Sequence, residues 1–235
     1  MDRTGVLSQR LAHEKGYEVI KPSDLSAIQS LRSKLVELAK SSSIDDLRHE
    51  LTKLSNAEIN EIMISLLQFT HASGLLANAF RDTIRSLCGN EIFLQRRANI
   101  IMNLPGDKQR HQWPHYEFMS GISPYTYTIW LPLHDLLDQS GIFYLTDYES
   151  LAHLKKEMDL GVANGPQMFE AVGNPKATKL CFGDAVIFNP FVIHGNTPFE
   201  SGNARLAISF RFQSATAPLY QKNSDFLKTW TLEGD

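Results

Sequence analysis

Hydrophobic residues in the first part of the chain recur three and four positions apart, which is the spacing of amphipathic helices. Ser55 and Glu58 have the spacing of a capping box, in which each side chain bonds the backbone N–H of the other. Gly89 is a typical residue for ending a helix. The expected elements are a strand at 16–20 and four helices. The first is capped by Ser23 or Asp24, and the others begin near Ser43, Ser55 and Ala72, the last one ending at Cys88.

The pattern changes after Asn90, where short runs of β-branched and aromatic residues alternate with turn signals. We also expect a short helix at 147–158 and a loop at 161–174. A helical front followed by many short strands predicts a mainly β fold of the α+β class, an antiparallel sandwich or barrel braced by helices. The expected strands lie at 92–102, 125–131, 141–145, 179–182, 185–188, 191–194 and 204–212.

Charge and composition narrow the possible partners of the 235 residues. The formal net charge of -3 argues against a nucleic-acid or anionic-membrane binder, because such proteins present a basic face. No apolar run approaches the roughly 18 to 20 residues that span a bilayer. Cys88 and Cys181 lie far apart in apolar settings, which indicates buried thiols in a reducing compartment. We therefore expect a cytoplasmic protein with a small-molecule substrate, and leave its oligomeric state open.

Three residues are candidates for a metal site. In an extended strand residues two apart project from the same face, so His115 and Glu117 can direct an imidazole and a carboxylate at one point. His194, at the end of a distant apolar run, can complete the set. Two histidines and one carboxylate on one face of a metal are typical of non-haem Fe(II) oxygenases.

Each of these residues also has an ordinary interpretation. A His-x-Glu triplet arises often by chance, and a lone histidine that closes an apolar strand is commonly a hydrogen-bonded core residue. His111 remains a competing ligand, with a zinc site as the competing chemistry. Pro114 disfavours a helix in which His111 and His115 would be paired.

The expected strand at 204–212 has one apolar face and one polar face. Arg205, Ser209 and Arg211 alternate with apolar residues, so they share the face that looks into a polar cavity. A buried arginine requires an anion, because an unpaired buried charge costs several kcal/mol. A dicarboxylate co-substrate would supply that anion, with Ser209 as an additional donor. An internal ion pair on an exposed sheet is the alternative.

These residues resemble a known family. His194-Gly195-Asn196 and Arg205-Leu206-Ala207-Ile208-Ser209, with Arg205 eleven positions after His194, are similar to the C-terminal motif of Fe(II)/2-oxoglutarate dioxygenases of the phytanoyl-CoA hydroxylase type. His115-x-Glu117 stands where that family has His-x-Asp. The segments 103–107, 129–133 and 183–184 follow the family's order. The resemblance covers about residues 90–215, with 16–17 as a plausible part of the first strand.

The resemblance implies a double-stranded β-helix, the jelly-roll or cupin-like fold, and an activity of the EC 1.14.11 type that uses O2. It implies one dioxygenase domain over 1–235, with helical support at 1–90, the core at 91–215 and a tail at 216–235. Family members that halogenate lack the carboxylate, so Glu117 indicates hydroxylation or a related oxidation. The implied roles are Fe(II) binding by His115, Glu117 and His194, a salt bridge from Arg205 to the distal carboxylate of 2-oxoglutarate, and lining of that site by Ser209 and Trp130.

The stretch from Trp130 to Leu133 resembles family members from bacterial surface-carbohydrate gene clusters. This suggests a sugar or nucleotide sugar as substrate, and Arg96, Arg97 and Arg211 are candidates for contacting an anionic one. The segments 107–124 and 147–174 are candidate lids. Two rival interpretations stay open: a non-catalytic sugar-binding protein with this fold, and an oxygen-independent cupin-like isomerase.

Overall fold

The computed structural model describes residues 3–13, 15–67, 72–107, 111–137, 142–145, 177–200, 202–219 and 226–232. The expected helix at 147–158, the loop at 161–174 and the whole candidate lid at 147–174 lie outside these ranges, as does part of the candidate lid at 107–124.

Helices make up most of the chain before residue 90, as the hydrophobic spacing predicts. Polar side chains fix their starts: Asp24 accepts a backbone hydrogen bond at 2.8 Å and Ser43 accepts one at 3.1 Å. The capping box is present, because the Ser55 N–H donates to Glu58 at 2.8 Å and the Glu58 N–H donates to Ser55 at 3.4 Å. The helices are α1 (Arg3–His13), α2 (Leu25–Leu38), α3 (Ile44–Leu51), α4 (Asn56–Leu67), α5 (Ala72–Ala79) and α6 (Arg81–Cys88).

Two features of this helical part differ from expectation. The chain begins with α1, a helix that the sequence pattern did not predict. The single helix expected over 72–88 is two helices, because Phe80 leaves helical dihedral angles with φ −110° and ψ 21°.

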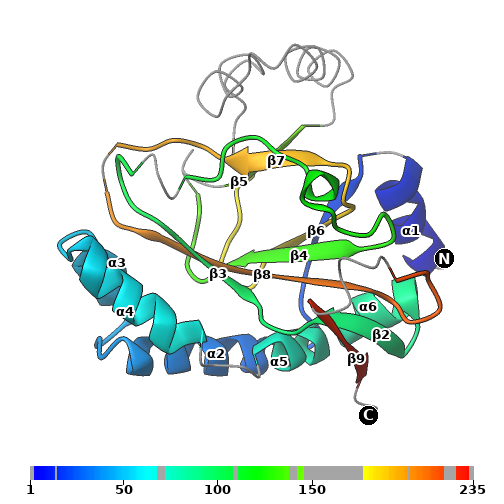
Figure 1. Ribbon diagram of the computed structural model, residues 1–235, viewed down its shortest axis with the longest axis horizontal. Helices are drawn as coiled ribbons and strands as arrows, with labels where there is room; N and C mark the ends of the chain where they lie inside the picture. The colour runs from blue at the N-terminus through cyan, green and yellow to red at the C-terminus, as the bar shows by residue number, and fades with distance from the viewer. Residues whose placement is uncertain are drawn as a thin grey trace.

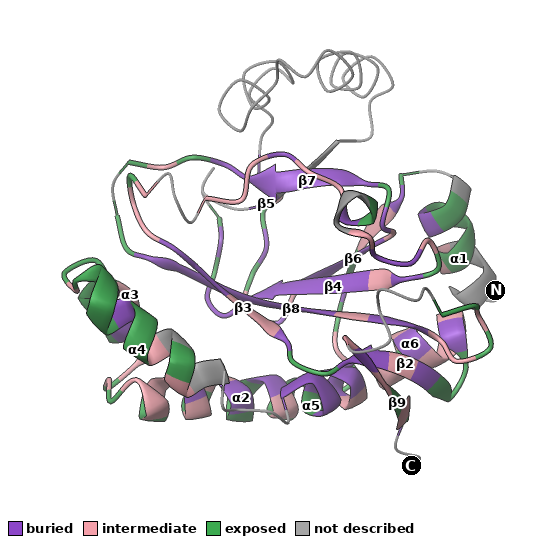
Figure 2. Ribbon diagram, viewed as in Figure 1, coloured by how far each residue is buried: buried purple, intermediate pink, exposed green. Residues whose placement is uncertain are grey.

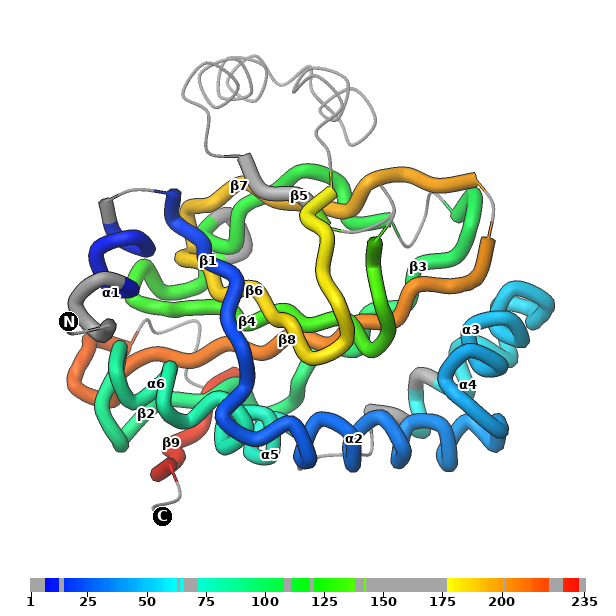
Figure 3. Tube along the Cα trace, turned by 180° about the vertical axis from the view of Figure 1, so that it is seen from behind, coloured from blue at the N-terminus to red at the C-terminus, as the bar shows by residue number. Residues whose placement is uncertain are grey.

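The strands form one large antiparallel sheet and a separate pair. In the large sheet the order is β1-β6-β4-β8-β2-β9, and β3 also pairs with β8. β5 pairs with β7 in the small sheet. Figure 3 shows β1 running beside β6, far from it in the sequence. The strands are β1 (Tyr17–Ile20), β2 (Glu91–Gln95), β3 (Asn99–Asn103), β4 (Tyr127–Pro132), β5 (Ile142–Leu145), β6 (Ala185–Phe188), β7 (Ile193–Asn196), β8 (Arg205–Ser214) and β9 (Leu227–Thr231).

The predicted fold class, a β-rich jelly roll braced by helices, is confirmed. The strand expected at 179–182 is wrong, since Leu180 and Phe182 form only isolated bridges. The expected tail at 216–235 includes β9, which pairs with β2 and extends the sheet. The division into helical support, core and tail otherwise stays a prediction.

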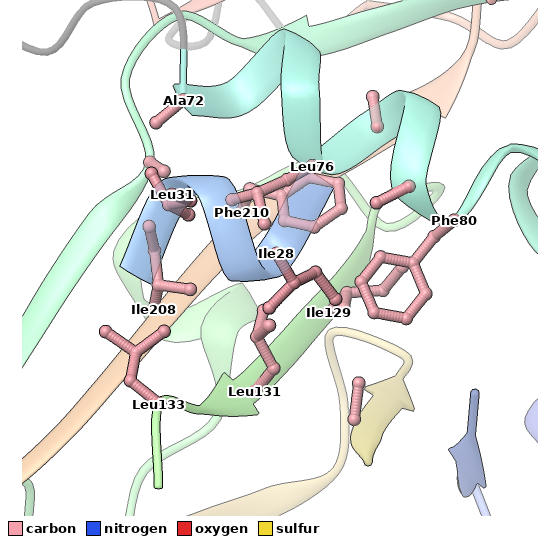
Figure 4. Packing of buried hydrophobic residues seen from close by; sticks show 14 of the residues in the cluster. Ile28, Leu31, Ala72, Leu76, Phe80, Ile129, Leu131, Leu133, Ile208 and Phe210 are labelled. Atoms are coloured by element: carbon pink, nitrogen blue, oxygen red, sulfur yellow. The ribbon is translucent and has the colours of Figure 1, made fainter. Parts of the chain in front are cut away.

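The large sheet lies between a helical layer and the small sheet (Figure 1). Ile28 and Leu31 of α2 and Leu76 of α5 pack against Ile129 of β4 and Phe210 of β8 (Figure 4). Burial of these side chains is the main stabilising force that fixes the sheet on the helices. The strands are largely buried, whereas the outward side of α3 and α4 is exposed (Figure 2).

β8 separates two buried clusters. Its residues Leu206, Ile208, Phe210 and Phe212 belong to the cluster on the helical side, as the alternation predicts. Ala207 belongs to a second cluster between the two sheets, together with Trp130. The polar residues of β8 share the Ala207 face because side chains alternate along a strand. β8 therefore presents these polar residues to the space between the sheets.

The cysteines and helices bear on two further expectations. Cys88 is buried, and burial raises the pKa of its thiol to about 12. Cys181 is exposed, so the expectation that both thiols are buried is wrong for this one. Among the described residues, no helix has the length and apolar character required to cross a bilayer.

Candidate metal centre

Backbone pairing brings together two histidines that are far apart in the sequence. The N–H of His115 donates to the carbonyl of His194 at 2.9 Å, and the N–H of His194 donates back at 2.9 Å. His194 lies on β7, whereas His115 forms an isolated bridge rather than part of a longer strand. The two imidazole rings are on the same side, with centroids 4.4 Å apart.

Glu117 reaches the same point two residues after His115. The intervening Tyr116 is extended, with φ −129° and ψ 145°, and Glu117 begins a 3₁₀ helix at Glu117–Ser120. Its Oε1 lies 3.8 Å from Nε2 of His194. One ligand atom from each of His115, Glu117 and His194 lies within 4.8 Å of the others. His111 is not in this group, which is the only candidate metal cluster among the described residues.

Backbone carbonyls orient both imidazoles. Nδ1 of His115 lies 2.7 Å from the carbonyl of Trp113, and Nδ1 of His194 lies 3.0 Å from that of Val192. A carbonyl only accepts, so Nδ1 is the protonated nitrogen in each contact and Nε2 keeps its lone pair. Burial lowers the pKa of His194 well below its ordinary value, and the neighbouring imidazole of His115 lowers it further. His194 is therefore a neutral imidazole, the form that binds metals.

Arg211 is bound to the carboxylate of this cluster. Its Nη2 donates to both oxygens of Glu117, at 2.7 and 2.6 Å, and the two side chains are 13% and 5% exposed. Buried Gln95 accepts from the backbone N–H of Arg211 at 3.0 Å and from its Nη1 at 3.4 Å. Alternation along β8 placed Arg211 on the correct face, but no pattern in the sequence indicates Glu117 as its partner.

The residues expected to hold a co-substrate lie on the face of the sheet that looks between the two sheets. Arg205 is 4% exposed, donates to the carbonyl of Thr197 at 2.8 Å, and has its guanidinium carbon 3.8 Å from the ring centroid of Phe199. Ser209 and Trp130 are cross-strand neighbours on β8 and β4. Trp130 is 5% exposed, and its Nε1–H has no hydrogen-bond partner among the described residues.

Arg96 and Arg97 lie in the connection between β2 and β3, and both are exposed. They line a cavity of about 470 Å³ together with Gln95, Asn99 and Phe226. Asn99 donates to Ser209 at 3.4 Å, and Gln95 contacts Arg211. This cavity therefore adjoins the polar face of β8.

Several solved structures whose names mention a non-heme enzyme, bound iron or bound nickel have the same fold. Iron-bound EctD from S. alaskensis matches with a TM-score of 0.58 and 14% identity over 97% of this chain and 86% of its own. HygX from Streptomyces hygroscopicus, with nickel and 2-oxoglutarate bound, gives 0.55 and 13% over 100% and 96%. The non-heme monooxygenase ThoJ in a nickel complex gives 0.56 and 12% over 90% and 79%.

No family model matches the sequence, and no curated protein matches it. The similarity to solved structures establishes the fold of the chain, and its chemistry depends on its own side chains. At such low identities a shared fold can host different activities.

Proposed function

We propose that this protein is an Fe(II)- and 2-oxoglutarate-dependent oxygenase that oxidises a small molecule with O2. The observation that carries the proposal is the convergence of two imidazole nitrogens and one carboxylate oxygen, all within 4.8 Å of one another, at a site where Glu117 and His194 are buried and His115 is partly buried. His115, Glu117 and His194 would hold the metal through one face, which is the donor set of non-haem iron oxygenases. Bound Fe(II) would supply activation of O2 and oxidation of a substrate C–H bond.

The polar face of β8 fits 2-oxoglutarate. Arg205 would pair with the distal carboxylate, because a buried guanidinium gains most from an anion that it can grip through parallel hydrogen bonds. Ser209 and the Nε1–H of Trp130, which no described residue accepts, would add neutral donors beside it. The solved structure of HygX with nickel and 2-oxoglutarate has the same fold, which supports this assignment.

The protein's own groups would position the reactants and exclude water. The low exposure of Glu117, His194 and Arg205 keeps bulk water from the ligand cluster. Fixed Nδ1 hydrogen bonds hold both imidazoles in the orientation that a metal requires. The carboxylate at position 117 leaves no ligand vacancy for a halide, which favours hydroxylation or a related oxidation.

For the primary substrate we propose a small anionic molecule. Arg96 and Arg97 supply two guanidinium groups to the cavity of about 470 Å³ that adjoins β8. A nucleotide sugar of surface-carbohydrate biosynthesis, as the phytanoyl-CoA hydroxylase-like subgroup suggests, is the first class to test. The cytoplasmic location likewise stays a prediction.

A non-catalytic or oxygen-independent cupin-like protein is the second candidate. It is favoured by one observation: both oxygens of Glu117 are already bound by Arg211, so the carboxylate is satisfied within the protein. Anaerobic addition of Fe(II) and 2-oxoglutarate distinguishes the two. The oxygenase should develop a weak visible charge-transfer band and, after exposure to air, release succinate. Folded protein without the band would refute the oxygenase.

A further inference from the structure

The ion pair between Arg211 and Glu117 changes the charge that a metal ion meets. Nη2 of Arg211 is shared between both carboxylate oxygens at 2.7 and 2.6 Å. Oε1 is also the oxygen that lies 3.8 Å from Nε2 of His194, so the guanidinium is bound directly to the ligand cluster. A carboxylate in a metal site normally offsets part of the metal's charge. Here its charge is already offset by an arginine.

The guanidinium of Arg211 is held in this position from several sides. Gln95, which is 1% exposed, accepts from both the backbone and the side chain of Arg211. The amide of Gln95 in turn donates to Asn99 at 3.0 Å. The ring centroid of Phe226 lies 5.8 Å from the guanidinium carbon. Because these contacts restrain Arg211, its charge stays beside the cluster when a metal enters.

The charge balance of the cluster follows from these contacts. Histidines that bind metals do so as neutral imidazoles, and the charges of Glu117 and Arg211 cancel. A divalent cation therefore enters a set of ligands with no net negative charge, and Arg205 on the same strand face adds a further positive charge. Repulsion between like charges is strong where water is largely excluded. A dianion such as 2-oxoglutarate would relieve it.

We propose that Arg211 makes metal binding at this centre depend on an anionic ligand, so that the bare divalent ion binds weakly and 2-oxoglutarate strengthens its retention. The inference rests on the proposed function, because it takes His115, Glu117 and His194 as metal ligands. By linkage, the metal strengthens 2-oxoglutarate binding by the same factor. Chelation alone couples the two ligands, and the charge of Arg211 adds to that coupling.

The test is a titration of the full chain with Mn²⁺, in which calorimetry measures the affinity with and without 2-oxoglutarate. Arg211→Gln and Arg211→Met remove the charge, whereas Arg211→Lys keeps it. Arg10→Gln is the matched control, since it removes an arginine from an Arg–Glu pair, the one with Glu18 at 3.0 Å, that is exposed and lies outside the ligand cluster. Circular dichroism and melting curves verify that each variant is folded.

The sign of the change in affinity distinguishes charge from orientation. The charge mechanism predicts that both neutral variants bind Mn²⁺ alone about tenfold or more tightly than the wild type. Their gain in affinity on adding 2-oxoglutarate should shrink, while Arg211→Lys and Arg10→Gln stay near the wild type. If Arg211 only oriented Glu117, its removal would instead weaken Mn²⁺ binding by roughly 10–100-fold.

Weaker or unchanged Mn²⁺ binding in folded Arg211→Gln and Arg211→Met would overturn the inference and leave the proposed function standing. Failure of the wild type itself to bind Mn²⁺, with or without 2-oxoglutarate, would overturn the proposed function. The two failures are therefore distinguishable in one set of titrations.

Discussion

Replacing Trp130 by phenylalanine should weaken 2-oxoglutarate binding while changing stability little. The substitution removes the Nε1–H, a buried donor without a partner among the described residues, and keeps an aromatic ring between Ser209 and Val186 on the neighbouring strands. If that donor bonds a carboxylate of 2-oxoglutarate, its loss should cost about 1.5–3 kcal/mol, or roughly 10- to 150-fold in the dissociation constant.

The stability of the same variant follows from two opposing terms. Removing an unsatisfied buried donor relieves about 1–3 kcal/mol of desolvation penalty. The smaller ring leaves a cavity of a few tens of Å³, which costs about 1 kcal/mol. The free energy of unfolding should therefore change by no more than about 2 kcal/mol, well below the roughly 3–5 kcal/mol lost when a large core aromatic is truncated to alanine.

Calorimetry with Mn²⁺-loaded protein measures the affinity, and urea unfolding measures the stability. Trp230→Phe is the matched control, because the Nε1–H of Trp230 is also buried without a partner among the described residues. Trp230 packs against the hydrophobic cluster on the helical side of the sheet, whereas the polar residues of β8 face the other side. An unchanged affinity in Trp130→Phe, or an equal loss in both variants, would show that Trp130 does not contact the co-substrate.

Three further predictions concern the same region. Arg205→Ala should weaken 2-oxoglutarate by about 1.5–3 kcal/mol or more, as measured by calorimetry; an unchanged affinity would mean that another cation binds the distal carboxylate. His194→Ala should abolish stoichiometric iron retention in a folded protein, as measured by metal analysis after desalting, and retained iron would remove His194 from the site. Burial, together with the charge of Arg48, lowers the pKa of His134 from 6.5 to about 4. Between these two pH values the unfolded chain binds a proton at His134 that the folded chain does not, so acid destabilises the fold. Stability from this group is complete above pH 6.5 and falls by about 2 kcal/mol at about pH 5. The side chain of His134→Gln can still accept the hydrogen bond from the Leu206 N–H but does not titrate. Between about pH 7 and pH 5 this variant should lose less free energy of unfolding than the wild type, as measured by urea unfolding, and an identical loss would contradict the reasoning.

The sequence predicted the parts of the site that depend on local periodicity. Residues two apart on an extended backbone share a face, and this placed His115 with Glu117 and put Arg205 on the polar side of its strand. The pairing of Arg211 with Glu117 was not predictable, because it joins side chains 94 positions apart and leaves no periodic signal.

The errors in the fold also arise from tertiary contacts. The run at 179–182 has the composition of a strand, but Leu180 pairs with Leu136 in an isolated bridge and not in a ladder. The sequence pattern does not predict β9, because its pairing partner, β2, lies more than a hundred positions earlier. Local propensity is a weak guide where distant partners decide the outcome.

The reciprocal backbone hydrogen bonds between His115 and His194 have a consequence for redesign. Because main-chain atoms form these bonds, the separation of the two positions is independent of which side chains occupy them. The backbone therefore holds the two positions side by side, and residues with other donor atoms can be introduced at both by mutagenesis. Variants at these two positions would show which sets of donor atoms the same backbone can hold together.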